Sequence, residues 1–141
     1  MPTNPDRGSA REAANVAKRP LRLLLVEDTA ANQKLVSRIL GKRGHLVEIA
    51  EDGRTAVRLV REKEFDVVLM DVQLPVMNGF EAAAAIRAIG DPGKSRVPIV
   101  ALTAHAMKED QDRCLEAGMN ACISKPIDSR ELIAIVEGFG S

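Results

Sequence analysis

Aromatic residues are scarce in this 141-residue chain: they make up 2% of it, and tryptophan and tyrosine are both absent. A hydrophobic core must therefore be aliphatic, built from Val, Leu, Ile, Ala and Met. The scarcity also argues against a protein that stacks the bases of single-stranded nucleic acid on aromatic side chains. Lysine plus arginine and aspartate plus glutamate both number 20, and the resulting net charge of +0 implies no general attraction to nucleic acid or to an anionic membrane.

Cysteines and long apolar runs are also few. Cys114 and Cys122 are the two cysteines, and their spacing is not the CxxC of a metal or redox motif, so we expect reduced thiols. No apolar run approaches the roughly 20 residues that cross a bilayer. The N-terminus lacks the apolar core of a signal peptide. These observations predict a cytoplasmic protein that makes no direct contact with a membrane.

The length of the chain fits one domain, and its hydrophobic and charged fractions, 45% and 28%, are ordinary for a globular protein. Residues 1–20 differ from the rest, because Pro, Gly, Ser, Asn and charged residues are frequent there and large apolar residues are rare. Such a segment buries too little surface to offset the entropy of ordering it. We predict a flexible leader or linker over residues 1–20 and one folded domain over residues 21–141.

Short apolar runs alternate with helical patterns from residue 21 onward. Strands are predicted over residues 22–27, 46–50, 67–71, 98–102 and 121–124. Helices are predicted over residues 31–42, through 56–60, and over 80–89, 107–117 and 129–137, with a Gly/Pro loop over 90–96. The connections are too long for hairpins and suit right-handed crossovers, which predicts a parallel sheet. We therefore expect an α/β protein with a flavodoxin-like doubly wound fold and strand order 2-1-3-4-5.

Polar residues follow four of these apolar runs directly. Glu27 and Asp28 end the first run, Asp71 the third, Thr103 the fourth and Lys125 the fifth. In an open parallel sheet, ligands bind outside the carboxyl ends of the strands, so these groups should meet at one edge. Three crowded carboxylates repel one another unless a cation balances them, and Mg²⁺ prefers such hard oxygen ligands. A lone aspartate at a strand end is usually a helix cap, but these partners favour a nucleophilic carboxylate that accepts a phosphoryl group.

Four motifs together carry a resemblance to a known family: LVED at residues 25–28 with the following Asn32 and Gln33, LMDVQLPVMNG at 69–79, ALTAHA at 101–106 and ISKP at 123–126. The chain resembles the receiver domains of response regulators in two-component signalling, and above all those of hybrid sensor histidine kinases. The resemblance covers about residues 21–138. It implies either a stand-alone receiver or, more in keeping with the linker-like leader, a receiver that is part of such a kinase.

The resemblance implies a Mg²⁺-dependent transfer of a phosphoryl group from a phosphohistidine, on a histidine kinase or a histidine phosphotransfer domain, to the receiver. The receiver would catalyse this transfer and a slow hydrolysis of the product, and would signal by changing conformation. It would be monomeric as an isolated domain and would bind no nucleic acid. The implied site comprises Asp71 as phosphoacceptor, Thr103 and Lys125 as phosphate contacts, and Glu27, Asp28, Asp71 and the backbone carbonyl of Gln73 around the metal.

Some positions depart from the family pattern, and others match positions that control how long the phosphoryl group lasts in the family. Family members usually carry Tyr or Phe three residues before the conserved lysine, where this chain has Cys122, so we expect output to depend more on the first helix and the loops of the site. Asn78 replaces a frequent aspartate and keeps the turn chemistry. Gln73 and His105 lie two residues after the phosphoacceptor and the threonine, where the resemblance implies control of the phosphoryl lifetime. An exposed loop residue remains an alternative interpretation of His105.

Three other functions remain open. A phosphohydrolase with an aspartate nucleophile commonly needs a second aspartate two residues further on, where this chain has Gln73. A nucleotide or flavin binder would need a Gly-rich phosphate loop after the first strand, and residues 29–31, Thr-Ala-Ala, supply none. A degenerate receiver that only docks partners would not need the complete set of acids, threonine and lysine.

Overall fold

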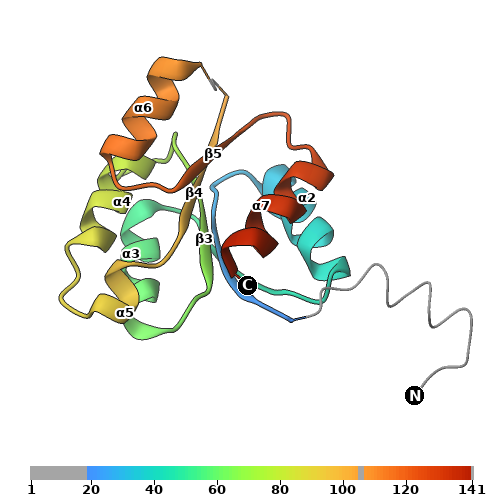
Figure 1. Cartoon of the computed structure of the whole chain (residues 1–141), viewed down its shortest axis with the longest axis horizontal. Coiled ribbons are helices and arrows are strands. Elements are labelled where there is room, and N and C mark those ends of the chain that lie inside the picture. The colour runs from blue at the N-terminus through green and yellow to red at the C-terminus, as the bar shows by residue number, and fades with distance from the viewer. Residues whose placement is uncertain (1–18, 105–106, 141) are drawn as a thin grey trace, which may run out of the picture.

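The computed structural model describes residues 19–104 and 107–140 and has helices on both faces of a central sheet (Figure 1). The strands are β1 Arg22–Val26, β2 Leu46–Ala50, β3 Val67–Asp71, β4 Ile99–Thr103 and β5 Ala121–Ser124. The helices are α2 Ala30–Lys42, α3 Gly53–Glu62, α4 Gly79–Arg87, α5 Pro92–Ser95, α6 Lys108–Glu116 and α7 Ser129–Gly140. None of the helices in the described part of the chain has the length and apolarity to span a membrane.

The five strands are all parallel and lie in the order β2-β1-β3-β4-β5, which confirms the predicted fold and strand order. Neighbouring strands end within a residue or two of each other, so their carboxyl ends form one edge of the sheet. The pairs near that edge are Val26 with Met70, Asp71 with Leu102, and Thr103 with Ser124. Strand β2 lies at the outer margin of the sheet, where it pairs with β1, so β1 separates it from β3 and Asp71.

The sheet separates two hydrophobic clusters, because successive side chains of a strand point to opposite faces. Leu24 and Val26 of β1 belong to the cluster under α3, α4 and α6, whereas Leu23 and Leu25 pack under α2 and α7. Figure 1 shows α2 and α7 together on one side of the sheet and α3 and α4 on the other. The buried hydrophobic residues in both clusters are aliphatic, methionine or cysteine, as the composition predicted. Each fully buried leucine contributes about 1.5–3 kcal/mol relative to an exposed one.

Side chains at the helix starts explain where α3 and α4 begin. The carboxylate of Asp52 accepts a hydrogen bond from the backbone N–H of Thr55 at 2.7 Å, and this bond lowers the pKa of Asp52. Asn78 caps α4 and forms a reciprocal capping box with Glu81. Both caps satisfy N–H groups that the first turn of a helix leaves unpaired. They also fix the two loops that precede these helices, one of which follows Asp71.

The two largest differences from the prediction concern α5 and α7. The expected loop over residues 90–96 contains the short helix α5, in which Asp91 accepts a hydrogen bond from Gly93 N–H at 2.9 Å and Pro92 occupies the first turn. Four residues are too few to show helical periodicity in a sequence. Helix α7 continues three residues beyond the predicted end at residue 137, because Gly140 packs closely against Leu21 and extends the buried face.

Candidate functional site

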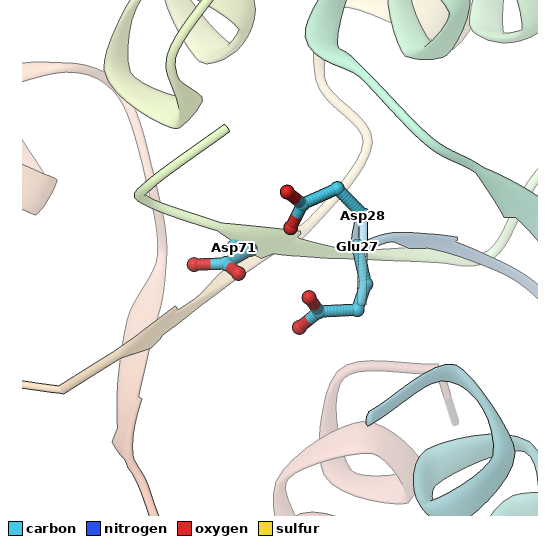
Figure 2. Close-up of side chains that lie close together, drawn as sticks. All are labelled: Glu27, Asp28 and Asp71. Carbon is cyan, nitrogen blue, oxygen red and sulfur yellow. The ribbon is translucent and has the colours of Figure 1, made fainter. Parts of the chain in front are cut away.

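Three carboxylates meet at the carboxyl ends of β1 and β3 (Figure 2). Glu27 and Asp28 directly follow β1, and Asp71 is the last residue of β3. One oxygen atom from each side chain lies within 4.8 Å of the others, and Figure 2 shows the three groups converging beyond the strand ends. Glu27 and Asp71 are buried, with 0% and 4% exposure, whereas Asp28 is exposed. The predicted cluster is therefore assembled, and one of its members faces solvent.

Lys125 reaches two of these carboxylates from the segment that follows β5. Its Nζ atom lies 3.0 Å from Asp71 Oδ2 and 3.4 Å from Glu27 Oε1. Burial by itself lowers the pKa of Lys125, but the hydrogen bonds and negative charges of Asp71 and Glu27 outweigh it, so this pKa lies above its usual value. One ammonium against three ionised carboxylates leaves the cluster with two excess negative charges. Because like charges at this separation repel, the cluster would gain from a divalent cation.

Backbone and amide groups hold the two buried carboxylates in place. Glu27 Oε2 accepts a hydrogen bond from Thr29 N–H at 3.0 Å, and the Glu27 carbonyl accepts one from Gln33 Nε2 at 2.7 Å. Asp71 Oδ1 accepts one from Gln73 N–H at 3.0 Å. Neither Thr29 nor Gln33 was predicted to hold Glu27 in place. A glutamine in the first turn of the helix after an acidic pair is the signal that could have identified the second contact.

Thr103 and Lys125 are joined through the backbone of adjacent strands. Thr103 is the last residue of β4 and is 8% exposed, and its carbonyl accepts a hydrogen bond from Lys125 N–H at 2.8 Å. Ser124 of β5 lies opposite it in the sheet register. The hydroxyl of Thr103 and the ammonium of Lys125 thus belong to neighbouring strand ends at the edge that carries Asp71, as predicted. The Lys125–Pro126 peptide bond is cis.

The loop after Asp71 is tightly held against the strand ends. Val72 N–H donates to the Leu102 carbonyl at 3.0 Å, and Gly79 N–H donates to the Val72 carbonyl at 2.9 Å. A Cβ atom at Gly79 would collide with the carbonyl oxygen of Asp71 and lie 2.8 Å from Val72 Cα, so only glycine fits there. Within this loop Val76 has a φ of 68°, and Met77 N–H donates to the Pro75 carbonyl at 2.7 Å. These two features describe a γ-turn around Val76.

Two of the positions predicted to modulate the site, Cys122 and Gln73, lie within the described residues. Cys122 on β5 is half-buried next to Cys114 of α6, and both are free thiols. Burial raises the pKa of Cys114 to about 12, with a further contribution from Cys122, and burial also raises the pKa of Cys122. The side chain at this position is therefore a compact neutral thiol. Gln73 is exposed, and His105 lies outside the described residues.

The oxygen atoms and the ammonium group at this edge of the sheet suit particular ligands. Carboxylate and carbonyl oxygens suit Mg²⁺, which keeps several waters and binds through few protein ligands. A carboxylate between a cation site and an ammonium can act as a nucleophile toward a phosphorus atom, because the opposing charges balance those on the phosphoryl oxygens. A hydroxyl at the neighbouring strand end can donate to such an oxygen. The site can therefore hold a divalent cation and a phosphoryl group side by side.

Comparison with known proteins agrees with this geometry. The model of the response regulator receiver domain family matches residues 23–137. The sensor protein GacS of Pseudomonas syringae is 43% identical over 122 residues, which cover 86% of this chain and 14% of GacS. Such relatives are many times longer than this chain, which spans 14% of GacS and 7% of a hybrid signal transduction histidine kinase of Dictyostelium discoideum.

Solved structures show the same likeness. The receiver domain of a sensor histidine kinase from Pseudomonas aeruginosa, determined with a magnesium ion coordinated in its active-site cleft, is 40% identical, with a TM-score of 0.78 over 87% of this chain and 100% of that one. In yeast, the receiver domain of the response regulator Ssk1, solved with the histidine phosphotransfer protein Ypd1, gives 32% identity and a TM-score of 0.79 over 86% of this chain and 89% of that one. The chain therefore belongs to the response regulator receiver domains of two-component phosphorelay systems.

Proposed function

We propose that this receiver accepts a phosphoryl group on Asp71 from a phosphohistidine, in a reaction that depends on Mg²⁺. The observation that carries the proposal is the placement of three carboxylates within 4.8 Å of one another, with the Lys125 ammonium 3.0 Å from Asp71. The magnesium ion in the similar P. aeruginosa receiver supports the choice of cation. Asp28, Asp71 and the Gln73 carbonyl would hold the ion directly, and Glu27 would hold it through water.

In the transfer, an oxygen of Asp71 forms a bond to phosphorus while the phosphorus–nitrogen bond to the donor imidazole breaks and its electron pair returns to the ring. The bound cation supplies charge balance for the phosphoryl oxygens. Lys125 would leave its present carboxylate partners for a phosphoryl oxygen, and Thr103 would donate its hydroxyl to another. Since the backbones of these two residues are hydrogen-bonded at 2.8 Å, their movements would be coupled. Slow attack by water on the acyl phosphate would reverse the signal.

The partner in this proposal is a histidine kinase or a histidine phosphotransfer domain. The yeast complex supports a phosphotransfer domain, because it pairs such a protein with a similar receiver. The similarity to GacS, over 14% of that protein, supports a receiver that forms one part of a hybrid histidine kinase. We propose that this reaction takes place in the cytoplasm. We also propose that the folded domain begins near residue 21.

Phosphorylation by acetyl phosphate, followed by intact mass spectrometry, tests the proposal. We expect one Mg²⁺-dependent adduct on the wild type that is stable to acid and labile to base, because an acyl phosphate has these properties. The Asp71→Asn variant should carry none. Asp112→Asn, which changes an exposed acid of α6, should match the wild type. An adduct that persists in Asp71→Asn, or that forms equally well in EDTA, would contradict the assignment.

A further inference from the structure

A second surface feature lies between α3 and α4, on the face of the sheet away from α2 and α7 (Figure 1). It is an open groove of about 620 Å³. Its apolar lining comes from Val57 of α3, Ala85 of α4 and Met77 of the loop before α4. Arg54, Arg58 and Arg61 supply most of the charged rim, and one carboxylate, that of Glu62, supplies the rest. An apolar surface edged by arginine is the composition typical of protein–protein interfaces.

The three arginines form a stripe along one side of α3, because their spacing of i, i+4 and i+7 returns to the same helix face. All three are exposed. Arg58 contacts Glu62 at 3.3 Å, but both side chains are more than half exposed, and such surface pairs are weak. Arg54 and Arg61 form no salt bridge with any residue that the structure describes. The stripe is thus a local excess of positive charge on a chain whose net charge is +0.

The groove is formed by closely packed elements. A Cβ atom at Gly53, the first residue of α3, would lie 2.6 Å from the Met77 carbonyl oxygen, so α3 and this loop are in direct contact. The small side chain of Ala85 leaves room for a bulky group to approach α4. An occupant of the groove would therefore touch two helices and the loop that leads away from Asp71.

We propose that this arginine-edged groove docks an acidic amphipathic helix of a partner protein. Leucine-like side chains of the partner would cover Val57, Met77 and Ala85, and its carboxylates would pair with the three guanidinium groups. Arginine suits this role because its planar fork binds carboxylates in a bidentate manner. A polyphosphate or nucleic acid would satisfy the arginines but leave the apolar lining uncovered. The docking itself does not depend on phosphorylation of Asp71.

A designed peptide tests the proposal on the full chain. The probe is a synthetic helical peptide with leucines at i, i+4 and i+7 and glutamates on either side, and its control has lysines in place of the glutamates. Chemical-shift changes in the ¹⁵N-labelled protein locate the binding site. We expect them over α3, Met77 and α4 for the acidic peptide, with an affinity that falls as salt rises. No binding of the acidic peptide, equal binding of the lysine peptide or shifts centred elsewhere would overturn the proposal.

Charge-reversal variants test whether peptide binding depends on the groove or only on the overall charge of the protein. The variant R54E/R58E/R61E should bind the acidic peptide at least tenfold more weakly than the wild type. The variant R22E/R38E/R130E changes three exposed arginines on β1, α2 and α7 by the same total charge and should bind within about twofold of the wild type. Equal losses in both variants would overturn the proposal. Circular dichroism of both variants confirms that they are folded.

A second copy of this chain is the competing occupant, because α6 carries exposed acids at Glu109, Asp112 and Glu116 next to exposed Leu115. Sedimentation velocity distinguishes the two. If the groove binds a partner protein, the wild type and R54E/R58E/R61E should show the same sedimentation behaviour at every protein concentration. If the wild type associates and this variant does not, the groove belongs to a second copy, and the proposal of a partner protein is wrong.

Discussion

Val76 shows how a single residue of the loop after Asp71 stores strain. Its φ of 68° lies in the left-handed region, and its side chain is 76% exposed, so no packing compensates for the conformation. A β-branched side chain at positive φ is unusual, and such a conformation costs on the order of 1–3 kcal/mol. The hydrogen bonds around Gly79 and Val72 hold the loop at both ends and maintain the turn.

Replacing Val76 with asparagine should relieve this strain, because asparagine tolerates positive φ far better than valine. We expect Val76→Asn to raise the free energy of unfolding by about 1 kcal/mol. Urea denaturation of both proteins measures the difference. Val76→Ile keeps the β-branch and should leave the stability within about 0.5 kcal/mol of the wild type. If Val76→Asn were no more stable than Val76→Ile, the strain at this position would be disproved.

Helix α7 is anchored to the amino-terminal end of the sheet by a partly buried polar network. His45 Nδ1 accepts a hydrogen bond from Leu21 N–H at 3.0 Å, which leaves Nε2 as the donor to Glu137 Oε2 at 2.9 Å. Arg43 donates to both oxygens of Glu137, at 2.8 and 2.7 Å. One carboxylate of α7 therefore ties together the first strand and the turn before the second.

The pKa of Glu137 is lowered, first by its hydrogen bonds from Arg43 and then by those from His45. A carboxyl with a lower pKa in the folded state stabilises the fold above its unfolded pKa, near 4.5, and this contribution disappears as pH falls through the lower folded value. We therefore expect wild-type stability to fall more steeply than that of Glu137→Gln below about pH 4.5. Urea denaturation at a series of pH values measures both slopes. The exposed control Glu62→Gln should follow the wild type, and parallel curves for Glu137→Gln would refute the argument.

At the scale of the whole molecule, the candidate site exists only when the sheet is complete. Lys125 and Glu27 are separated by 98 positions in the chain, and Lys125 and Asp71 by 54. Their approach requires β1, β3, β4 and β5 to be in register. An unfolded chain disperses these groups, so a cation held by the cluster would bind the folded state almost exclusively and stabilise it.

Magnesium should therefore raise the free energy of unfolding, by about 1.4 kcal/mol when its free concentration is ten times its Kd. Thermal or urea unfolding at increasing Mg²⁺ measures the effect without reference to phosphorylation. Asp28→Asn removes one proposed ligand and should shift the response to higher concentration, whereas Asp112→Asn should respond as the wild type does. A wild-type stability that is indifferent to Mg²⁺ would be incompatible with the proposed site.

Most of the sheet and the carboxylate cluster could be predicted because both depend on local pattern. Each apolar run ends in a polar residue, and the parallel order brings Asp71, Thr103 and Lys125 to one edge. Other contacts depend on how distant elements pack, and the sequence contains no periodic pattern that predicts them. Lys125 bridges two carboxylates from different strands, and Gln33 binds the backbone of Glu27.

The same physical distinction explains where the element boundaries differ. Helix α5 is too short to show a repeat, and α7 continues to Gly140 because of its contact with Leu21, which lies more than a hundred positions away in the chain. The expected leader over residues 1–20 falls largely outside the described residues and stays a prediction. The roles of His105 and Cys122 in the phosphoryl lifetime and in output also stay predictions.

The raised pKa of Cys114 makes this cysteine a natural reporter of unfolding. A thiol with a pKa of about 12 is ionised in roughly one molecule in 10⁵ at neutral pH, and only the thiolate reacts with alkylating reagents. Because the side chain is also buried, alkylation in the native state must wait for the protein to open. Peptide mapping separates the Cys114 adduct from any adduct on half-buried Cys122, and the rate at which iodoacetamide modifies Cys114 would then follow the stability of α6 against β5, without any engineered label.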